Sequence, residues 1–308
     1  MNDFFKGLDE LFLKGDLAEI ESYIKKYLNA LEEKGEELSR ASVLNELAGF
    51  YRGVSRYEES AECFGNSLEI LKSNGMANTP QYATVLLNYA GTYRLSGKTE
   101  KAVSLFLTAK EMLEDTGQKE SYQYGSILNN LALAYQETGD IRKADEMATQ
   151  ALAIMKNMDA SEHEVATSLN NLASIRLRTG NIESAEELAE EALRMYDAME
   201  KENVHHAAAL STMATVLFRR NRYEESVKCY EKALELTNRF FGNNIEYSVT
   251  LHNMAVAYEA MGDTEKALKN QAAALELMES LVGMEDSRSI SYRRMLERLQ
   301  KQIKGNAK

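Results

Sequence analysis

The sequence contains no tryptophan, a single proline and only two cysteines in 308 residues. Because proline interrupts helix interiors, its near absence favours a chain that is helical along most of its length. Two cysteines are too few for a disulfide framework. We therefore expect the protein to work in a reducing, cytoplasmic environment.

Long apolar runs and an excess of basic residues are also missing. We find no stretch of roughly 18 apolar residues that could span a bilayer, and no N-terminal segment with the pattern of a signal peptide. The formal net charge is −12, which argues against nucleic acid or an anionic membrane as the main partner. With 44% hydrophobic and 27% charged residues, the composition is that of an ordinary folded protein.

What the sequence does contain is a repeated unit, seen most clearly over residues 124–155. Leu128, Leu131 and Ala132 recur at helical spacing, and Gly139 then ends the pattern, because glycine tolerates the positive φ of a helix terminus. A second apolar stripe follows, and its alanines allow a neighbouring helix to approach closely. The unit therefore predicts a tight antiparallel helical hairpin, which must stack on copies of itself to bury both faces.

The turn of this unit recurs along the chain every 40 to 42 residues, by subtraction of the residue numbers. The turn residues are Gly15, Ser55, Gly97, Gly139, Gly180, Asn221 and Gly262. From the second repeat on, the residue seven before the turn is Ala48, Ala90, Ala132, Ala173, Ala214 and Ala255. The residues five and twelve after the turn are also mostly small, as at Ala144 and Ala151. Small residues at three fixed places indicate one repeated scheme of helix packing.

This pattern resembles the tetratricopeptide repeat, whose units carry small residues at the same three places. The longer period, together with Leu-Asn-Asn-Leu-Ala at 128–132 and 169–173, is similar to the kinesin-light-chain subclass. The resemblance implies an all-α fold, an α-α superhelix that forms a right-handed solenoid. We expect seven hairpins over residues 1–287 and a capping helix with a frayed tail over residues 288–308. The first hairpin is divergent, because it lacks the small contact residue before Gly15.

Asparagine recurs in the first helix of the hairpins, the helix that lines the inner surface of such arrays. We number each repeat so that the alanine seven residues before the turn is the eighth position. The fifth and sixth positions carry Asn45 and six further asparagines that we expect in the groove: Asn88, Asn129, Asn130, Asn170, Asn171 and Asn253. Asparagine is a mediocre helix former, so its recurrence lowers helix stability, and no packing contact evident from the sequence explains it.

Two roles for these asparagines remain open. The resemblance implies that they hold the backbone of an extended peptide, since a side-chain amide both donates and accepts hydrogen bonds. The alternative is a structural role, in which they bridge adjacent helices. The two roles are not exclusive.

Four arginines are expected on the same inner surface, at the twelfth or thirteenth position: Arg52, Arg94, Arg178 and Arg219. On so acidic a chain they predict a local positive patch, which suits a peptide carboxylate because arginine binds carboxylates bidentately. It is equally open that they pair with Glu137, Glu259 or other helical neighbours.

Residues for chemistry are few and scattered. The four histidines belong to different repeats, except the adjacent His205 and His206, which do not share a helix face. Cys63 and Cys229 occupy the same repeat position four repeats apart, too far to form a disulfide. We therefore expect no catalytic residue, no metal site and no cofactor, and we do not expect an enzyme.

The sequence thus predicts an interaction scaffold that binds an extended protein or peptide segment in a concave groove, as a monomer or a weak homodimer through a terminal face. The alternative is a signalling regulator, similar to bacterial peptide-pheromone receptors, whose superhelical conformation changes when a short peptide binds. A receptor for chaperone tails is disfavoured, because it needs basic residues at the second position. The chain has Ser42, Thr84 and Ser126 there.

Overall fold

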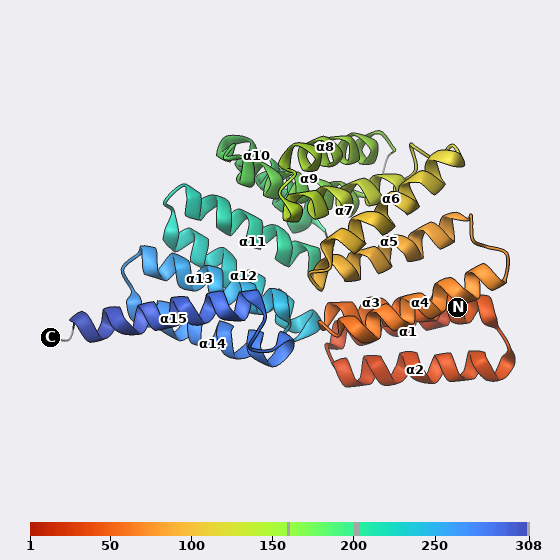
Figure 1. Cartoon of the computed structure of the whole chain (residues 1–308), viewed down its shortest axis with the longest axis horizontal. Helices are drawn as coiled ribbons and strands as arrows, with labels where there is room; N and C mark the ends of the chain where they lie inside the picture. The colour runs from red at the N-terminus through yellow and green to blue at the C-terminus, as the bar shows by residue number, and fades with distance from the viewer. Residues whose placement is uncertain (159–160, 200–203, 307–308) are drawn as a thin grey trace. The chain divides into compact units, whose positions relative to one another are not determined.

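The computed structural model describes residues 1–158, 161–199 and 204–306. Within these ranges the chain is all-α, as the sequence predicts, and contains no β-strand (Figure 1). The helices are α1 (Asn2–Lys14), α2 (Leu17–Lys34), α3 (Glu37–Gly53), α4 (Tyr57–Ser73), α5 (Pro80–Leu95), α6 (Thr99–Asp115), α7 (Tyr122–Thr138), α8 (Ile141–Asn157), α9 (Glu162–Thr179), α10 (Ile182–Ala198), α11 (Val204–Arg219), α12 (Tyr223–Phe241), α13 (Ile245–Ala260), α14 (Thr264–Val282) and α15 (Ser287–Asn306).

The chain divides into two compact units, Met1–Gly180 and Asn181–Lys308. In the first unit α1–α2, α3–α4, α5–α6 and α7–α8 pack as hairpins, and α9 packs on α8. In the second unit α11–α12 and α13–α14 are hairpins, α10 packs on α11, and α15 packs on α14. First helices of successive hairpins also touch, so that α3, α5, α7 and α9 follow one another in a single layer.

The mid-hairpin turns lie where the sequence places them. All seven predicted turn residues have a positive φ, between 61° and 87°. Ser55 and Asn221 adopt this left-handed conformation without being glycine, at φ 63° and 61°. The position in the repeat, rather than the residue type, therefore determines the backbone conformation at these turns.

The small residues at the three repeated places are the points where helices approach most closely. The six alanines at the eighth position are all fully buried. The Ser60 hydroxyl of α4 donates a hydrogen bond to the Ala48 carbonyl of α3 at 2.8 Å, and Ser67 does the same to Ala41 at 2.8 Å. A side chain as short as serine can bridge two helix backbones only if the helices lie close together.

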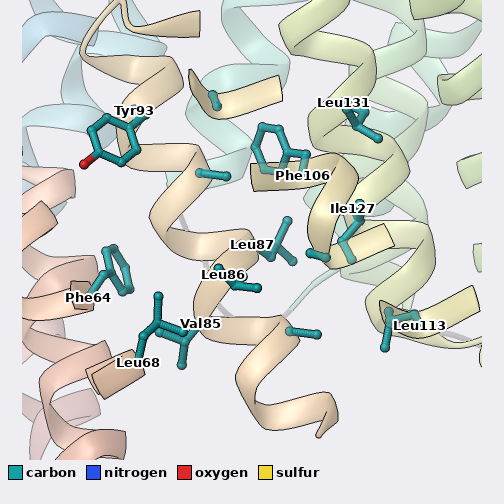
Figure 2. Close-up of a cluster of buried hydrophobic side chains, with 14 of the residues drawn as sticks. Phe64, Leu68, Val85, Leu86, Leu87, Tyr93, Phe106, Leu113, Ile127 and Leu131 are labelled. Carbon is teal, nitrogen blue, oxygen red and sulfur yellow. The ribbon is translucent and has the colours of Figure 1, made fainter. Parts of the chain in front are cut away.

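The core of the first unit lies between successive hairpins. Figure 2 shows Phe64, Phe106, Ile127 and Leu131 among the side chains of this core, which come from α4, α6 and α7. All four are fully buried. Neighbouring hairpins therefore bury each other's apolar faces, which a single hairpin could not bury alone.

The first hairpin keeps a small contact residue, but at a different position. Leu8 takes the place of the alanine, and the close approach occurs one residue earlier, at Gly7. A Cβ added to Gly7 would lie 2.4 Å from the Tyr23 hydroxyl oxygen. That hydroxyl donates a hydrogen bond to the Phe4 carbonyl at 3.2 Å. The hairpin is therefore divergent in sequence register while it retains the same packing principle.

Helix α15 occupies the segment that we expect to be a capping helix. Tyr292, Met295 and Leu299 are its buried apolar side chains, and Ser289 is a buried polar one. Residues 307 and 308, the end of the expected frayed tail, lie outside the described residues. The organisation into seven hairpins and a cap beginning at residue 288 stays a prediction.

Candidate functional site

The layer formed by α3, α5, α7 and α9 brings polar residues of successive repeats together. The Asn88 side-chain amide donates a hydrogen bond to Asn45 Oδ1 at 3.0 Å, which links α5 to α3. The Gln136 amide of α7 donates to Ser174 of α9, to both its carbonyl and its hydroxyl oxygen, at 3.2 Å. Polar side chains of neighbouring repeats therefore lie within hydrogen-bonding distance: the sixth position contacts the fifth of the preceding repeat, and the twelfth contacts the ninth of the following repeat.

The asparagines at the fifth position are enclosed between helices. Asn129 is 5% exposed and Asn170 is 8% exposed. The Asn129 amide donates to the Ser168 hydroxyl at 2.7 Å, and Ser168 in turn donates to the Glu164 carbonyl at 3.0 Å. The Oδ1 atoms of both asparagines are buried without a hydrogen-bond partner among the described residues. Their placement differs from our expectation of side chains on an open surface and corresponds to the structural alternative.

The asparagines at the sixth position are different. Asn88, Asn130 and Asn171 are half-buried, and none of their unpaired amide atoms is enclosed. Asn130 uses its Nδ2 to donate to the Ser126 carbonyl of its own helix at 3.0 Å, which leaves its Oδ1 unused. The Asn171 side chain makes no hydrogen bond to any described residue. In the second unit Asn253, on α13, is likewise half-buried with an unpaired amide in the described part of the chain.

The four predicted arginines do not share one environment. Arg94 pairs with Glu137 of α7, as the alternative interpretation proposed. Arg178 in the first unit and Arg219 in the second are exposed, and neither has an ion-pair partner among the described residues. Glu259 pairs with Arg298 of α15 instead of with one of the four.

Arg52 is the arginine most closely integrated into the inner layer. Its Nη1 donates a hydrogen bond to the Asn88 carbonyl of α5 at 3.1 Å. Burial, with a further contribution from the nearby Arg94, lowers the pKa of Arg52 to about 10, so it remains a cation at neutral pH. Burial also raises the pKa of the Glu46 carboxyl on the same helix, although that carboxyl accepts a hydrogen bond from Asn45 at 3.2 Å.

Two glycines at the ninth position, Gly49 and Gly91, belong to helices α3 and α5 of this layer, and the repeat pattern predicts no role for them. Glycine inside a predicted helix can be noticed in the sequence, because it lowers the stability of the helix relative to alanine and is therefore unusual there. Whether such a glycine is needed for packing depends on its neighbours in space, which the sequence does not specify.

Other kinds of site find no support in the described ranges. No group of three or more histidine, cysteine, aspartate or glutamate side chains there could hold a metal ion. Cys63 and Cys229 are free and half-buried, and burial raises the pKa of the Cys63 thiol to about 11. None of the helices in the described part of the chain is long and apolar enough to cross a membrane.

Stacked helical hairpins with close contacts at three small residues define a helical-repeat protein. Sequence models described as tetratricopeptide repeat match residues 39–115, 123–198 and 205–280, and a second model of the same description matches residues 170–239. The chain therefore belongs to the tetratricopeptide repeat family, as the small-residue pattern predicted. No curated protein matches the chain.

Solved structures share this fold. A Rap protein complexed with competence and sporulation factor has a TM-score of 0.72 at 17% identity, over 90% of this chain and 74% of that chain. NprR in complex with its cognate peptide NprX has a TM-score of 0.64 at 17% identity, over 97% and 87%. A chain of the APC/C hetero-tetramer Cut9–Hcn1 has a TM-score of 0.65 at 15% identity, over 95% of this chain. The present chain spans only 48% of that chain. At these identities the likeness shows the fold alone.

Proposed function

We propose that the chain is a protein-interaction scaffold that binds an extended segment of a protein or peptide partner along the inner face of α5, α7 and α9. The observation that carries this proposal is the half-buried Asn171 amide, which has no hydrogen-bond partner among the described residues. It lies in the same register as Asn88 and Asn130. A partly desolvated amide without a partner is unfavourable, and a peptide N–H and C=O would satisfy it.

The spacing of the helices agrees with an extended ligand. Packed helices lie about 8–10 Å apart, and an extended chain rises about 3.3 Å per residue. Asparagines on neighbouring helices would therefore meet the ligand backbone at about every third residue. Contacts to the backbone alone tolerate many sequences, so specificity must come from other side chains of the same surface.

We further propose a kind of partner, a cellular location and an oligomeric state for the chain. The net charge of −12 supports a protein or peptide partner over nucleic acid or an anionic membrane. The proposal includes no catalytic step, metal or cofactor, and the two free cysteines support a cytoplasmic location. Phe5 and Leu13 of α1 are 40% and 63% exposed, which supports a monomer or a weak homodimer through that terminal face.

The test uses a random library of capped peptides and the double variant Asn130→Ala/Asn171→Ala. We expect the wild-type chain to enrich a set of peptides, and the double variant to bind that set at least about tenfold more weakly, because it loses two amide contacts. Asn66→Ala is the matched control, since Asn66 is exposed on α4. The control should bind like wild type, and circular dichroism should give equal helicity for all three. Unchanged affinity in the double variant would contradict the proposal.

The alternative is a peptide-responsive regulator. It is supported by the fold shared with the Rap protein complexed with competence and sporulation factor and with NprR in complex with its cognate peptide NprX. Small-angle X-ray scattering with and without an enriched peptide separates the two proposals. A regulator should change its radius of gyration on binding, whereas a static scaffold should not.

A further inference from the structure

The Arg52 guanidinium lies across α5 with most of its hydrogen-bonding capacity unused. Nη1 donates to the Asn88 carbonyl at 3.1 Å and lies 3.1 Å from the place that a Cβ on Gly91 would occupy. No described carboxylate lies within ion-pair distance of Arg52, and none of its remaining nitrogens is buried without a partner. Arginine has five N–H donors, so at least two can still reach a ligand.

The charge of Arg52 is only weakly compensated by its surroundings. The neighbouring cation Arg94 forms an ion pair with Glu137, and Glu137 forms none with Arg52. Tyr57 and Glu46 attract Arg52 electrostatically, and Glu46 forms no ion pair with it. Arg52 is half-buried, and this burial lowers its pKa to about 10. A half-buried cation that lacks a contacting carboxylate is stabilised when an anion binds.

Gly49, the glycine at the ninth position of α3, leaves the surface beside this guanidinium open. Gly49 lies three residues before Arg52 on α3, so the two share a helix face. A Cβ added to Gly49 would meet no atom within 4 Å, and its φ is not positive, so neither packing nor backbone conformation requires glycine there. Glycine inside a helix nevertheless costs about 0.5–1 kcal/mol relative to alanine. Gly91 differs, because an added Cβ there would press on Arg52 itself.

We infer that Arg52, Gly49 and Gly91 form a subsite that takes an acidic side chain of the bound peptide. Arg52 binds the carboxylate through its unused N–H groups. The buried Gly91 lets the guanidinium lie against α5, and Gly49 leaves room for the peptide backbone that carries the carboxylate. This inference rests on the proposed function, because it places an acidic residue of the same peptide beside Asn88. It names the feature that adds sequence preference to otherwise backbone-directed binding.

The test repeats the selection with the capped peptide library, comparing wild type with Arg52→Gln. We expect wild type to prefer peptides with aspartate or glutamate at one position over their asparagine and glutamine counterparts. Arg52→Gln should lose this preference and bind the acidic peptides about 10- to 100-fold more weakly, the usual effect of a hydrogen bond to a charged group. It should bind the neutral counterparts as wild type does. An acidic preference that persists in Arg52→Gln overturns the inference.

The glycine variants give an independent readout. Gly49→Ala should unfold at higher urea concentration than wild type, because alanine favours helix and meets no neighbour, yet it should bind the enriched acidic peptide more weakly. Gly65→Ala is the matched control: an added Cβ on this α4 glycine meets only the Tyr89 hydroxyl, at 4.0 Å. It should be stabilised with unchanged binding. Unchanged binding in Gly49→Ala would refute the role of the glycines.

The failure of this inference can be distinguished from failure of the proposed function. If Asn130→Ala/Asn171→Ala loses binding of neutral and acidic peptides while Arg52→Gln loses nothing, only the subsite is wrong. If no peptide is enriched at all, or if the double variant binds normally, the proposed function itself is contradicted.

Discussion

At the scale of single residues, two adjacent asparagines of one helix have different surroundings. Asn129 is buried and donates a hydrogen bond to Ser168 of the neighbouring helix, whereas Asn130 is half-buried with an unused Oδ1. A helix turns by about 100° per residue, so neighbours in sequence point in different directions. The sequence predicts that asparagines recur, but only the position of Ser168 on the next helix shows which of the two is enclosed.

The arginines show the same limit of sequence reasoning. Their repeat positions predict one common surface. Whether an arginine forms an ion pair there depends on which residue lies about one repeat away. Glu137 lies opposite Arg94, while Arg52 has only a backbone carbonyl. Arg176, at a position where other repeats have tyrosine, pairs with Asp145 of α8 at 2.8 Å, which explains how a charged residue is accommodated there.

The close approach at the eighth position gives a prediction at this scale. Ala132 on α7 is fully buried, so Ala132→Leu must push neighbouring side chains or helices aside. We expect the free energy of unfolding to fall by about 1–3 kcal/mol, the usual cost of overpacking. Urea denaturation followed by circular dichroism measures the change. Thr149→Leu, at an exposed position of α8, should change it by no more than about 0.5 kcal/mol. Equal effects would show that the eighth position is not a tight contact.

At the scale of the helical elements, the turns were predictable and the first hairpin was not. The turns follow from a fixed spacing, which also holds where the residue is Ser55 or Asn221. In the first hairpin the small residue moved to Gly7, because Tyr23 packs against α1 there. A shift of one residue alters the helix face that approaches its neighbour, so an alignment on the turn alone cannot detect it.

The docking of α15 depends on a buried polar relay. The Gln271 amide nitrogen donates to the Tyr292 backbone carbonyl at 2.9 Å, and Gln271 Oε1 lies 2.8 Å from His252 Nδ1. Because a carbonyl can only accept, the amide orientation is fixed and Nδ1 must carry the proton that it donates to Gln271. The His252 ring also stacks on the Tyr292 ring, with centroids 4.1 Å apart. The relay therefore joins α13, α14 and α15.

This relay predicts a pH dependence of stability. Burial lowers the pKa of His252 below its ordinary value of 6.5, so the folded state binds fewer protons than the unfolded state. Its contribution is complete above pH 6.5 and declines as the pH falls below it. His163 acts in the same sense, and Glu46, with its raised pKa, acts in the opposite sense at lower pH.

The measurement is the urea midpoint of wild type and His252→Gln at pH values between about 7.5 and 5. We expect the wild type to lose more stability on acidification than the variant, so that the two curves converge or cross. The comparison cancels the contributions of His163 and Glu46, which both proteins share. Parallel curves would show that His252 titrates alike in the folded and unfolded states.

At the scale of the whole molecule, the sequence predicted the family and the repeat but not the division into two compact units. The spacing of turns and small residues continues without interruption past Gly180, where the first unit ends. Because the repeat spacing is the same before and after Gly180, the sequence pattern does not indicate where one unit ends and the next begins. The sixth position varies along the chain in a way that the eighth does not: from the second repeat on the eighth position is always alanine, while the sixth changes from Glu46 to asparagine and Thr212.

The most direct test of this account observes the asparagine side chains themselves. We would record the amide resonances of Asn129, Asn130, Asn170 and Asn171, assigned through single alanine variants, while adding an enriched capped peptide. The account predicts large shifts for Asn130 and Asn171, which contact the ligand, and small shifts for the enclosed Asn129 and Asn170. A peptide that binds but leaves the Asn130 and Asn171 resonances in place would contradict it.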